Sequence, residues 1–369
     1  MQDLHYYLGF NLVNGIGPAR LDRLIAYFGS LEEAWNGHTG DLALAGLDGR
    51  SIDALLEVRR TRDLEAEYER VVAAGVRIIS RDDPAYPALL RGIPASPPLL
   101  YVRGTLTEND RWALAVVGTR NCSNYGRDAA RKLVSDLAAA GVTIVSGLAL
   151  GIDAVAHEAA LAAGGRTLAV LGSGVDQIYP ATNRRLGEAL LHQGAIISEY
   201  PLGTIPVAAN FPARNRIISG LALGVLVVEA GVRSGALITV EFALEQGRDV
   251  FAVPGSIFSP RSEGTHRLIR DGATIVTRAE DVLDALNLQN AVEQQAVAAA
   301  VPETPEEAAL LRLIEAEPRH IDAITRDSAL SLPEVSATLA MLELKGLVKQ
   351  VGGMQYVLAR EDRAPYRVD

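Results

Sequence analysis

Short apolar runs alternate with amphipathic stretches between residues 81 and 286. Helical stretches such as Arg127–Ala140 and Ala236–Gln246 separate runs that are apolar at successive positions and therefore on both faces of a strand. Buried strands that alternate with helices predict a parallel sheet covered on both sides. We therefore expect a Rossmann-like, doubly wound, mainly parallel α/β core at 81–286. Its predicted strands are Ala113–Val117, Val142–Val145, Thr167–Leu171, Ala195–Ile197, Val225–Val228, Val250–Val253 and Ala273–Val276.

Residues 1–80 have a helical pattern. Gly15 and Gly17 form a turn before Pro18, a residue that is common at the first position of a helix. The apolar side chains that follow have helical spacing: Leu21, Leu24, Ile25 and Phe28. The pattern predicts a helix-hairpin-helix (SAM-like) domain whose exposed amides can bind a phosphate. A small helical bundle that uses the glycines for a tight turn is an equally good interpretation.

The remaining residues predict a linker, a third domain and a tail. Residues 287–304 are rich in Gln and Ala and lack aromatic side chains, which is typical of a linker or a frayed helix. Short helices and a hairpin with a Gly-Gly turn then predict a winged-helix domain at 305–360, followed by a tail at 361–369. Its expected recognition helix, 333–345, contains no arginine, and 305–360 hold 6 basic and 8 acidic residues. This composition favours a protein-interaction or regulatory role over sequence-specific DNA recognition.

Charge and composition exclude several classes of protein. The net charge of −10 argues against a general polyanion binder, but it divides unevenly. Residues 1–80 carry 8 basic and 12 acidic side chains, residues 81–285 carry 19 and 20, and residues 286–369 carry 8 and 13. The sequence contains one cysteine, and no apolar run approaches the ~18 residues that span a bilayer. It also shows no secretory signal. We therefore expect a soluble cytoplasmic protein without a membrane segment, a metal or a cofactor.

Four turns rich in glycine and small residues follow predicted strands. Because the carboxyl ends of parallel strands meet at one edge of a sheet, we expect these turns to converge, and each leads into a helix whose amides favour an anion. Glycine is also common in tight strand-to-helix turns, so one such turn alone would mean little. No Gly-x-Gly-x-x-Gly or P-loop motif is present, which disfavours a dinucleotide or nucleotide hydrolysis. The turns span 117–126, 146–153, 172–180 and 229–239.

Arginines and one aromatic side chain lie near these turns. Phe211 precedes Arg214 and Arg216 at the predicted start of a helix. Arginine binds phosphate in a bidentate manner and phenylalanine offers a face for a base, so this combination suits single-stranded nucleic acid. The alternative is that Arg214 and Arg216 pair with carboxylates inside the domain and Phe211 is part of the core. The arginines that follow or lie within the turns are Arg120, Arg184, Arg185 and Arg233.

Catalytic patterns are weak. Asp153 and His157 lie four residues apart, with Ser146 nearby, but such a set is more often a structural hydrogen-bond network than a catalytic one. His266 and Cys122 have no partner that the sequence suggests.

The ordered motifs closely resemble the DNA processing protein A family (DprA/Smf) over residues 81–285. The motifs are Tyr86-Pro-Ala-Leu-Leu, the run 146–157, Tyr179-Pro180, Ser198-Glu-Tyr-Pro201, the run 211–218, Ser234-Gly-Ala-Leu-Ile-Thr239 and the run 264–269. The resemblance implies a homodimer that binds and protects single-stranded DNA, loads RecA recombinase in natural transformation, and has no demonstrated catalysis. It implies a DNA pocket of Arg120, Gly147, Phe211, Arg214, Arg216 and Ser234, and dimerisation through His266, Leu268 and Ile269.

This chain departs from the family at two places. Many relatives have basic residues just after the Tyr-Pro and shortly before the Phe-Pro, where this chain has Ala181-Thr182 and Ala208-Ala209. Arg184 and Arg185 are candidates to replace them.

Two other functions are alternatives. The core is also similar to nucleotide-cleaving phosphoribohydrolases of the lysine-decarboxylase-like group, but their Pro-Gly-Gly motif is missing at 231–239. Their catalytic glutamate stands three positions after the threonine, where this chain has Phe242, and Glu241 comes one position too early. A transcription factor built on the winged helix is least favoured, because its recognition helix has no basic face.

Overall fold

The computed structural model describes residues 2–288, 304–314, 318–328, 330–344 and 348–358. They form two compact units, Met1–Leu288 and Gln289–Asp369. Most of the predicted linker at 287–304 and the whole predicted tail at 361–369 lie outside the described residues.

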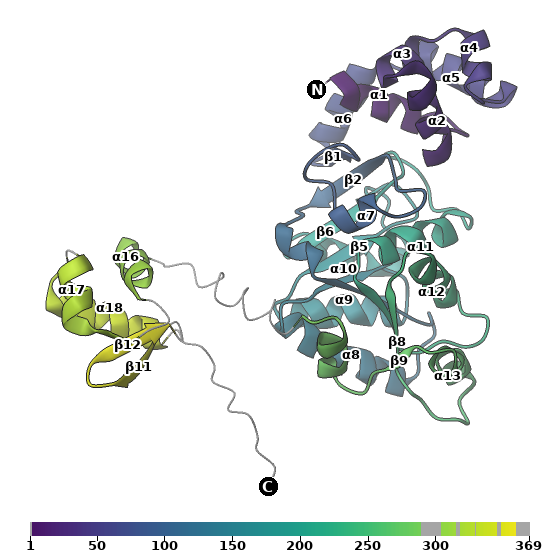
Figure 1. The fold of residues 1–369 in the computed structure, drawn as a ribbon. Helices are drawn as coiled ribbons and strands as arrows, with labels where there is room; N and C mark the ends of the chain where they lie inside the picture. The colour runs from purple at the N-terminus through teal and green to yellow at the C-terminus, as the bar shows by residue number, and fades with distance from the viewer. Residues whose placement is uncertain (1, 289–303, 315–317, 329, 345–347, 359–369) are drawn as a thin grey trace. The chain divides into compact units, whose positions relative to one another are not determined.

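A nine-stranded sheet forms the centre of the first unit (Figure 1), in the order β1-β2-β6-β5-β4-β3-β7-β8-β9. Neighbouring strands are parallel except where β2 pairs with β1 and β6, so β2 alone among these strands runs against the others. This confirms the Rossmann-like, mainly parallel fold. The strands are β1 Arg77–Ser80, β2 Leu99–Gly104, β3 Ala113–Val117, β4 Thr143–Ser146, β5 Thr167–Val170, β6 Gly194–Ser198, β7 Gly224–Val227, β8 Asp249–Ala252 and β9 Thr274–Ile275.

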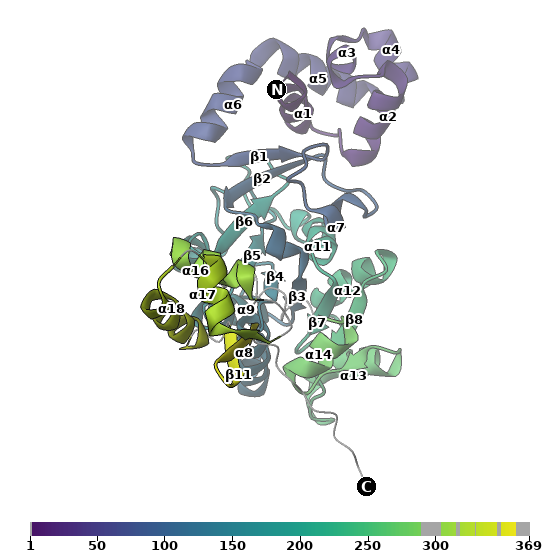
Figure 2. The same cartoon turned by 60° about the vertical axis from the view of Figure 1, so that its left-hand side comes forward.

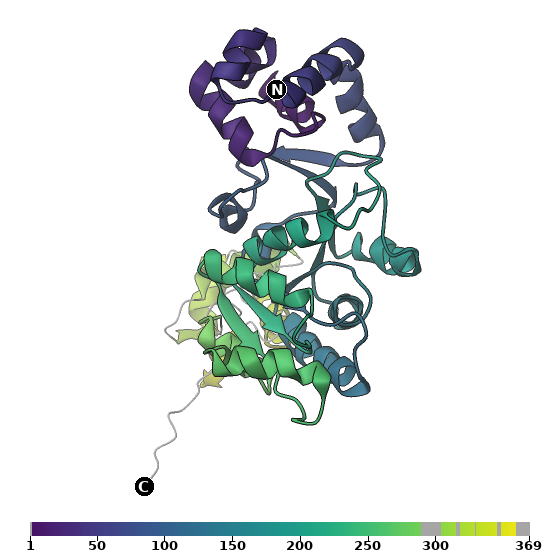
Figure 3. The same cartoon turned by 90° about the vertical axis from the view of Figure 1, so that its right-hand side faces the viewer.

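Helices cover both faces of the sheet (Figure 3). One face is covered by α8 (Asn124–Ala139), α9 (Ile152–Ala162) and α10 (Arg184–Leu190), and the other by α11 (Asn210–Gly220) and α12 (Ala236–Glu245). The strand order reverses at β3, which has β4 on one side and β7 on the other. Ligands of doubly wound sheets bind at such a reversal. The remaining elements of this part are α7 Ala88–Arg91, α13 Glu263–Arg270, α14 Ala279–Ala285 and the short 3₁₀ turns Glu108–Arg111, Ala181–Asn183 and Pro260–Ser262.

The N-terminal helices pack against β1 and β2 (Figure 2). Tyr7, Leu8 and Phe10 are at most 2% exposed and share one core with Ile78 and Tyr101 of those strands. The predicted turn is present, because Gly15 has φ +91° and α2 begins at Pro18. These helices are α1 Gln2–Asn11, α2 Pro18–Phe28, α3 Leu31–Asn36, α4 Thr39–Leu44, α5 Gly49–Thr61 and α6 Leu64–Ala73.

The second unit has the arrangement of a winged helix. Its core joins Leu310, Ile324 and Leu339, and Gly352 and Gly353 make the predicted turn with φ of +106° and +55°. Its third helix, α18 (Leu332–Leu344), carries no basic residue within the part that the structure describes. The elements are α16 Pro305–Leu313, β10 Arg319–His320, α17 Ile321–Ser328, α18 Leu332–Leu344, β11 Val348–Gly352 and β12 Gln355–Leu358.

None of the helices in the described part of the chain is long and apolar enough to cross a membrane.

Candidate nucleic-acid interface

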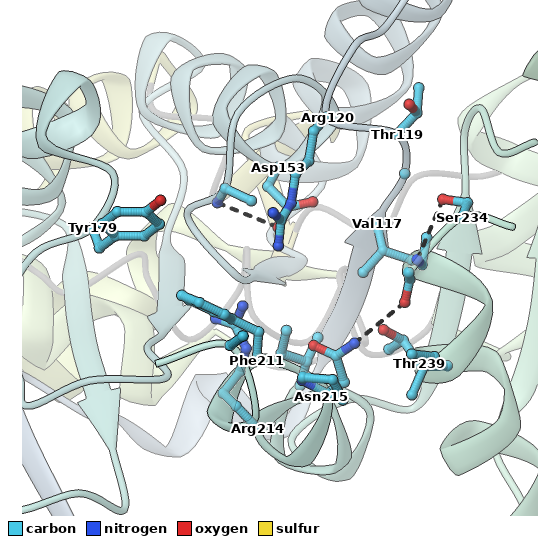
Figure 4. A pocket seen from close by; sticks show the side chains of 18 of the residues that line it. Val117, Thr119, Arg120, Asp153, Tyr179, Phe211, Arg214, Asn215, Ser234 and Thr239 are labelled. Carbon is cyan, nitrogen blue, oxygen red and sulfur yellow. Dashed lines mark hydrogen bonds between the residues drawn. The ribbon is translucent and has the colours of Figure 1, made fainter. Parts of the chain in front are cut away.

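A cavity of about 710 Å³ lies where the strand order reverses (Figure 4). All four predicted turns line it, which confirms that they converge: the first through 117–120, the second through Ala149 and Asp153, the third through Tyr179, and the fourth through 234–239. The start of α11 completes the wall. The cavity therefore collects the carboxyl ends of several parallel strands and the amino ends of the helices that follow them, which gives it a positive backbone potential.

Arg214 and Asp153 form the charged floor of the cavity. Arg214 is 4% exposed, and its Nη1 donates to the carbonyl oxygen of Gly147 at 2.9 Å and to that of Val170. The Asp153 carboxylate accepts from the amides of Gly147 and Ala149 at 3.2 and 3.4 Å. Burial raises the pKa of Asp153, against the opposing charge of Arg214, and burial lowers the pKa of Arg214 to about 10. The Nε of Arg214 has no partner among the described residues, so this group retains a donor.

Gly147 packs against this floor without lining the cavity itself. A Cβ at Gly147 would lie 2.6 Å from Nη2 of Arg214, which is closer than real Cβ contacts. Gly147 therefore leaves room for the guanidinium, its amide donates to Asp153, and its carbonyl oxygen accepts from Arg214. Its part in DNA binding stays a prediction.

Arg120, Phe211 and Ser234 lie where the sequence places them, on the cavity wall. Arg120 is exposed, and its Cζ is 5.7 Å from the ring centroid of Phe211. Phe211 is half-buried, so part of its ring faces the cavity (Figure 4). An exposed guanidinium beside an accessible aromatic ring can contact a phosphate and its base together.

Arg216 lies outside the lining of this cavity. Its Nη1 and Nη2 donate to the two carboxylate oxygens of Glu199 at 2.7 and 2.6 Å, and its Nε donates to the carbonyl oxygen of Ala95 at 3.1 Å. The Arg216 and Glu199 side chains are 11% and 15% exposed. The structure thus shows for Arg216 the internal ion pair that the sequence left open as an alternative.

The remaining predicted arginines are exposed but outside the cavity. Arg233 belongs to the fourth turn, and Arg185 to the first turn of α10. Arg184 borders a separate cavity of about 420 Å³ together with Ala181, whereas Ala208 lines the main cavity. The part of Arg184 and Arg185 in DNA binding therefore stays a prediction.

The Asp153, His157 and Ser146 set is structural. His157 is fully buried, with Nδ1 2.6 Å from the Thr167 hydroxyl, and Ser146 donates to the carbonyl oxygen of Val116 at 2.6 Å. Burial, with a smaller effect of the Arg214 charge, lowers the pKa of His157 to about 3. Within the residues described here, no group of three His, Cys, Asp or Glu side chains could hold a metal.

The predicted dimer residues lie on α13. His266 contacts the carbonyl oxygen of Gly255 at 3.0 Å, and Leu268 packs in part against the sheet core. The loop before α13 carries Ile257 and Phe258, which are 80% and 89% exposed, and no periodic pattern in the sequence singles out two apolar residues in a loop.

The motifs found in the sequence contain further side chains of the cavity wall that were not predicted as site residues, among them Tyr179, Asn215 and Thr239. Tyr179 belongs to the third glycine-rich turn, and its aromatic ring in that turn is the feature of the sequence that could have identified it as a site residue.

Comparison with known proteins identifies the family. Residues 77–287 match the model described as DNA recombination-mediator protein A, and residues 294–354 match the DprA winged helix domain. The chain is 37% identical to Protein Smf of Synechocystis over 95% of its length and 98% of that relative.

Two solved structures share the fold. The X-ray structure of DNA processing protein A (DprA) from Streptococcus pneumoniae aligns with a TM-score of 0.67 and 38% identity, over 76% of this chain and 97% of that one. DNA processing protein A from Helicobacter pylori, whose structure is described as giving insights into a single-stranded DNA binding mode, aligns with a TM-score of 0.51 and 28% identity, over 57% and 95%. With a family model that covers more than half of its residues and a relative that it matches over nearly the whole length of both chains, this chain, whose four strand-to-helix turns converge on one cavity, belongs to the DNA processing protein A (DprA/Smf) family.

Proposed function

We propose that this protein binds single-stranded DNA in the main cavity and loads RecA recombinase onto it during natural transformation. The observation that carries the binding proposal is Arg120 beside Phe211 at a cavity built from four strand-to-helix turns. The wall can hold phosphates through backbone amides and Arg120, and it can hold a base on Phe211, without reading sequence. The Helicobacter pylori relative, described by its single-stranded DNA binding mode, supports the same role here.

A salt titration tests the binding. Fluorescence anisotropy with a labelled oligothymidine should show affinity that falls as salt rises, and weaker binding to a duplex of equal length. Each phosphate contact contributes about 0.7 to the slope of log affinity against log salt for single strands, so Arg120→Ala should reduce the slope by about that amount. Lys132→Ala is the matched control, because it removes one positive charge from a side chain that is 76% exposed on α8, outside the cavity. An unchanged slope in Arg120→Ala would contradict the site.

RecA loading follows as a second step. A protein that holds single-stranded DNA can present it to a recombinase, and we expect this protein to shorten the lag of RecA ATP hydrolysis on an oligonucleotide coated by single-strand-binding protein. Arg120→Ala should lose the effect in proportion to its lost DNA affinity. A lag that the wild-type protein leaves unchanged would contradict the proposal.

Dimerisation through α13 is a further part of the proposal. His266, Leu268 and Ile269 lie near Ile257 and Phe258, so a partner would cover apolar side chains that water now contacts. Light scattering at micromolar concentration should give twice the monomer mass for the wild type and the monomer mass for Ile269→Arg. A wild-type monomer would contradict this interface.

The structure gives little support to the phosphoribohydrolase alternative. Among the described residues that line the cavity, Asp153 is the one carboxylate, and it is engaged by two backbone amides. Glu241 is exposed on α12 and outside the lining. We predict no release of adenine from AMP. Release that Glu241→Gln abolishes would restore the enzyme hypothesis.

A further inference from the structure

We propose that Tyr179 is a second base-stacking residue, so that the cavity receives two neighbouring bases of the strand, one on Tyr179 and one on Phe211. This inference rests on the single-stranded DNA function proposed above and adds to it a residue and a number of bases.

The two rings lie side by side at the cavity. Their centroids are 5.6 Å apart and their planes are inclined by 36°. Tyr179 comes from the turn after β5 and Phe211 from the first turn of α11, and both project toward the space below Arg120 (Figure 4). Two elements that are distant in the sequence therefore place neighbouring aromatic rings at the same cavity, and the Arg120 guanidinium lies over one of them, Phe211.

The surroundings of Tyr179 differ from those of a core tyrosine. Tyr86 is 2% exposed and donates its hydroxyl to the carbonyl oxygen of Pro97 at 2.7 Å, and Tyr101 is fully buried with its hydroxyl on Asn11. Tyr179 is 47% exposed, and its hydroxyl has no hydrogen-bond partner among the described residues. A large aromatic side chain that is half exposed beside a cavity has a free face for a ligand.

The ring spacing determines how many bases fit. A base sandwiched between two rings needs contact distances of about 3.5 Å on each side, which is about 7 Å between the rings. The observed 5.6 Å is too short for a sandwich. With the rings in this position, both can stack a base only if each stacks a different base on its outward face. Arg120, whose Cζ lies 5.7 Å from the Phe211 centroid, is then close to the phosphate of the nucleotide on Phe211.

Three substitutions separate stacking from charge and from packing. Tyr179→Leu keeps apolar bulk but has no flat face, Tyr179→Phe keeps the ring, and Tyr179→Trp enlarges it. In the oligothymidine assay, Tyr179→Leu should bind about 5- to 150-fold more weakly at every salt concentration, because loss of one stacked base has that effect. The slope against salt should stay at the wild-type value, since Tyr179 carries no charge. Tyr179→Phe and Tyr179→Trp should bind within about threefold of wild type.

An oligonucleotide with abasic sites supplies the second readout. When every second base is missing, no two neighbouring bases remain, so wild type should lose affinity and the difference between wild type and Tyr179→Leu should shrink. Equal affinity of Tyr179→Leu and wild type on intact oligothymidine would overturn the inference, as would a loss that Tyr179→Phe shares or one that lowers the salt slope. Absence of binding by the wild-type protein would instead overturn the proposed function.

Discussion

Arg216 offers a sharp test of how the structure assigns roles to the arginines. The family resemblance places it in the DNA pocket, whereas the structure engages both of its terminal nitrogens with Glu199. Arg216→Met removes the guanidinium and keeps most of the apolar stem. We expect this variant to be less stable than the wild type and to retain the wild-type number of phosphate contacts.

The expected loss follows from burial. Removing one partner of a buried ion pair costs about 3–5 kcal/mol, because the other charge stays buried without compensation. The Arg216 and Glu199 side chains retain 11% and 15% exposure, so Glu199 can recover some hydration, and we expect about 3 kcal/mol. Replacing both residues, as in Arg216→Met with Glu199→Gln, leaves no buried charge. The double variant should regain at least about 1.5 kcal/mol of that loss.

Urea unfolding of the full chain, followed by tryptophan fluorescence, measures these free energies. The chain contains two tryptophans, and both Trp35 and Trp112 belong to the Met1–Leu288 unit, so the signal reports that unit alone. Anisotropy under folding conditions then gives the salt slope. An unfolding free energy within about 0.5 kcal/mol of wild type, together with a slope reduced by about 0.7, would refute the ion-pair role and return Arg216 to the DNA pocket.

Two further predictions concern buried groups. The pKa of His157 is about 3 in the folded protein and about 6.5 when exposed, so its stabilising contribution is complete above pH 6.5 and is lost as pH falls toward 3, at up to about 1.4 kcal/mol per pH unit. Urea midpoints at pH 7, 6 and 5 should fall less steeply for His157→Gln than for wild type, and parallel trends would contradict the prediction. Gly151 has φ +78°, and a Cβ there would lie 2.2 Å from the carbonyl oxygen of Thr119, so Gly151→Ala should lose about 2–4 kcal/mol and weaken DNA binding. Gly92→Ala is its control, since Gly92 follows α7 with φ −84°, lies outside the cavity lining and has nothing within 4 Å of its Cβ position. Equal stability of the two variants would show that the turn at Gly151 tolerates a side chain.

The strands of the core could be predicted, but the full sheet could not. Runs that are apolar on both faces identified β3 to β9, because a strand between two helical layers has no polar face. An apolar run such as β2, Leu99–Gly104, does not reveal whether the strand runs parallel or antiparallel to its neighbours. The antiparallel pairing of β2 with β1 and β6 depends on contacts with residues distant in the chain. The sequence predicts a boundary between the helical domain and the core after residue 80. The structure pairs β1, Arg77–Ser80, with β2, so the last residues of the predicted helical domain belong to the sheet of the core.

The sequence alone determined that four small-residue turns meet at one edge, because parallel strands share the direction in which they end. It also supplied Arg120, Phe211 and Ser234, which lie in the turns or beside them. Only the tertiary structure decided between Arg214 and Arg216. The two are separated by two residues, about 200° around a helix, so α11 directs Arg214 to the floor of the cavity and Arg216 to Glu199. Which of those faces meets the cavity depends on how α11 packs against the sheet, and this packing is set by side chains from the whole unit.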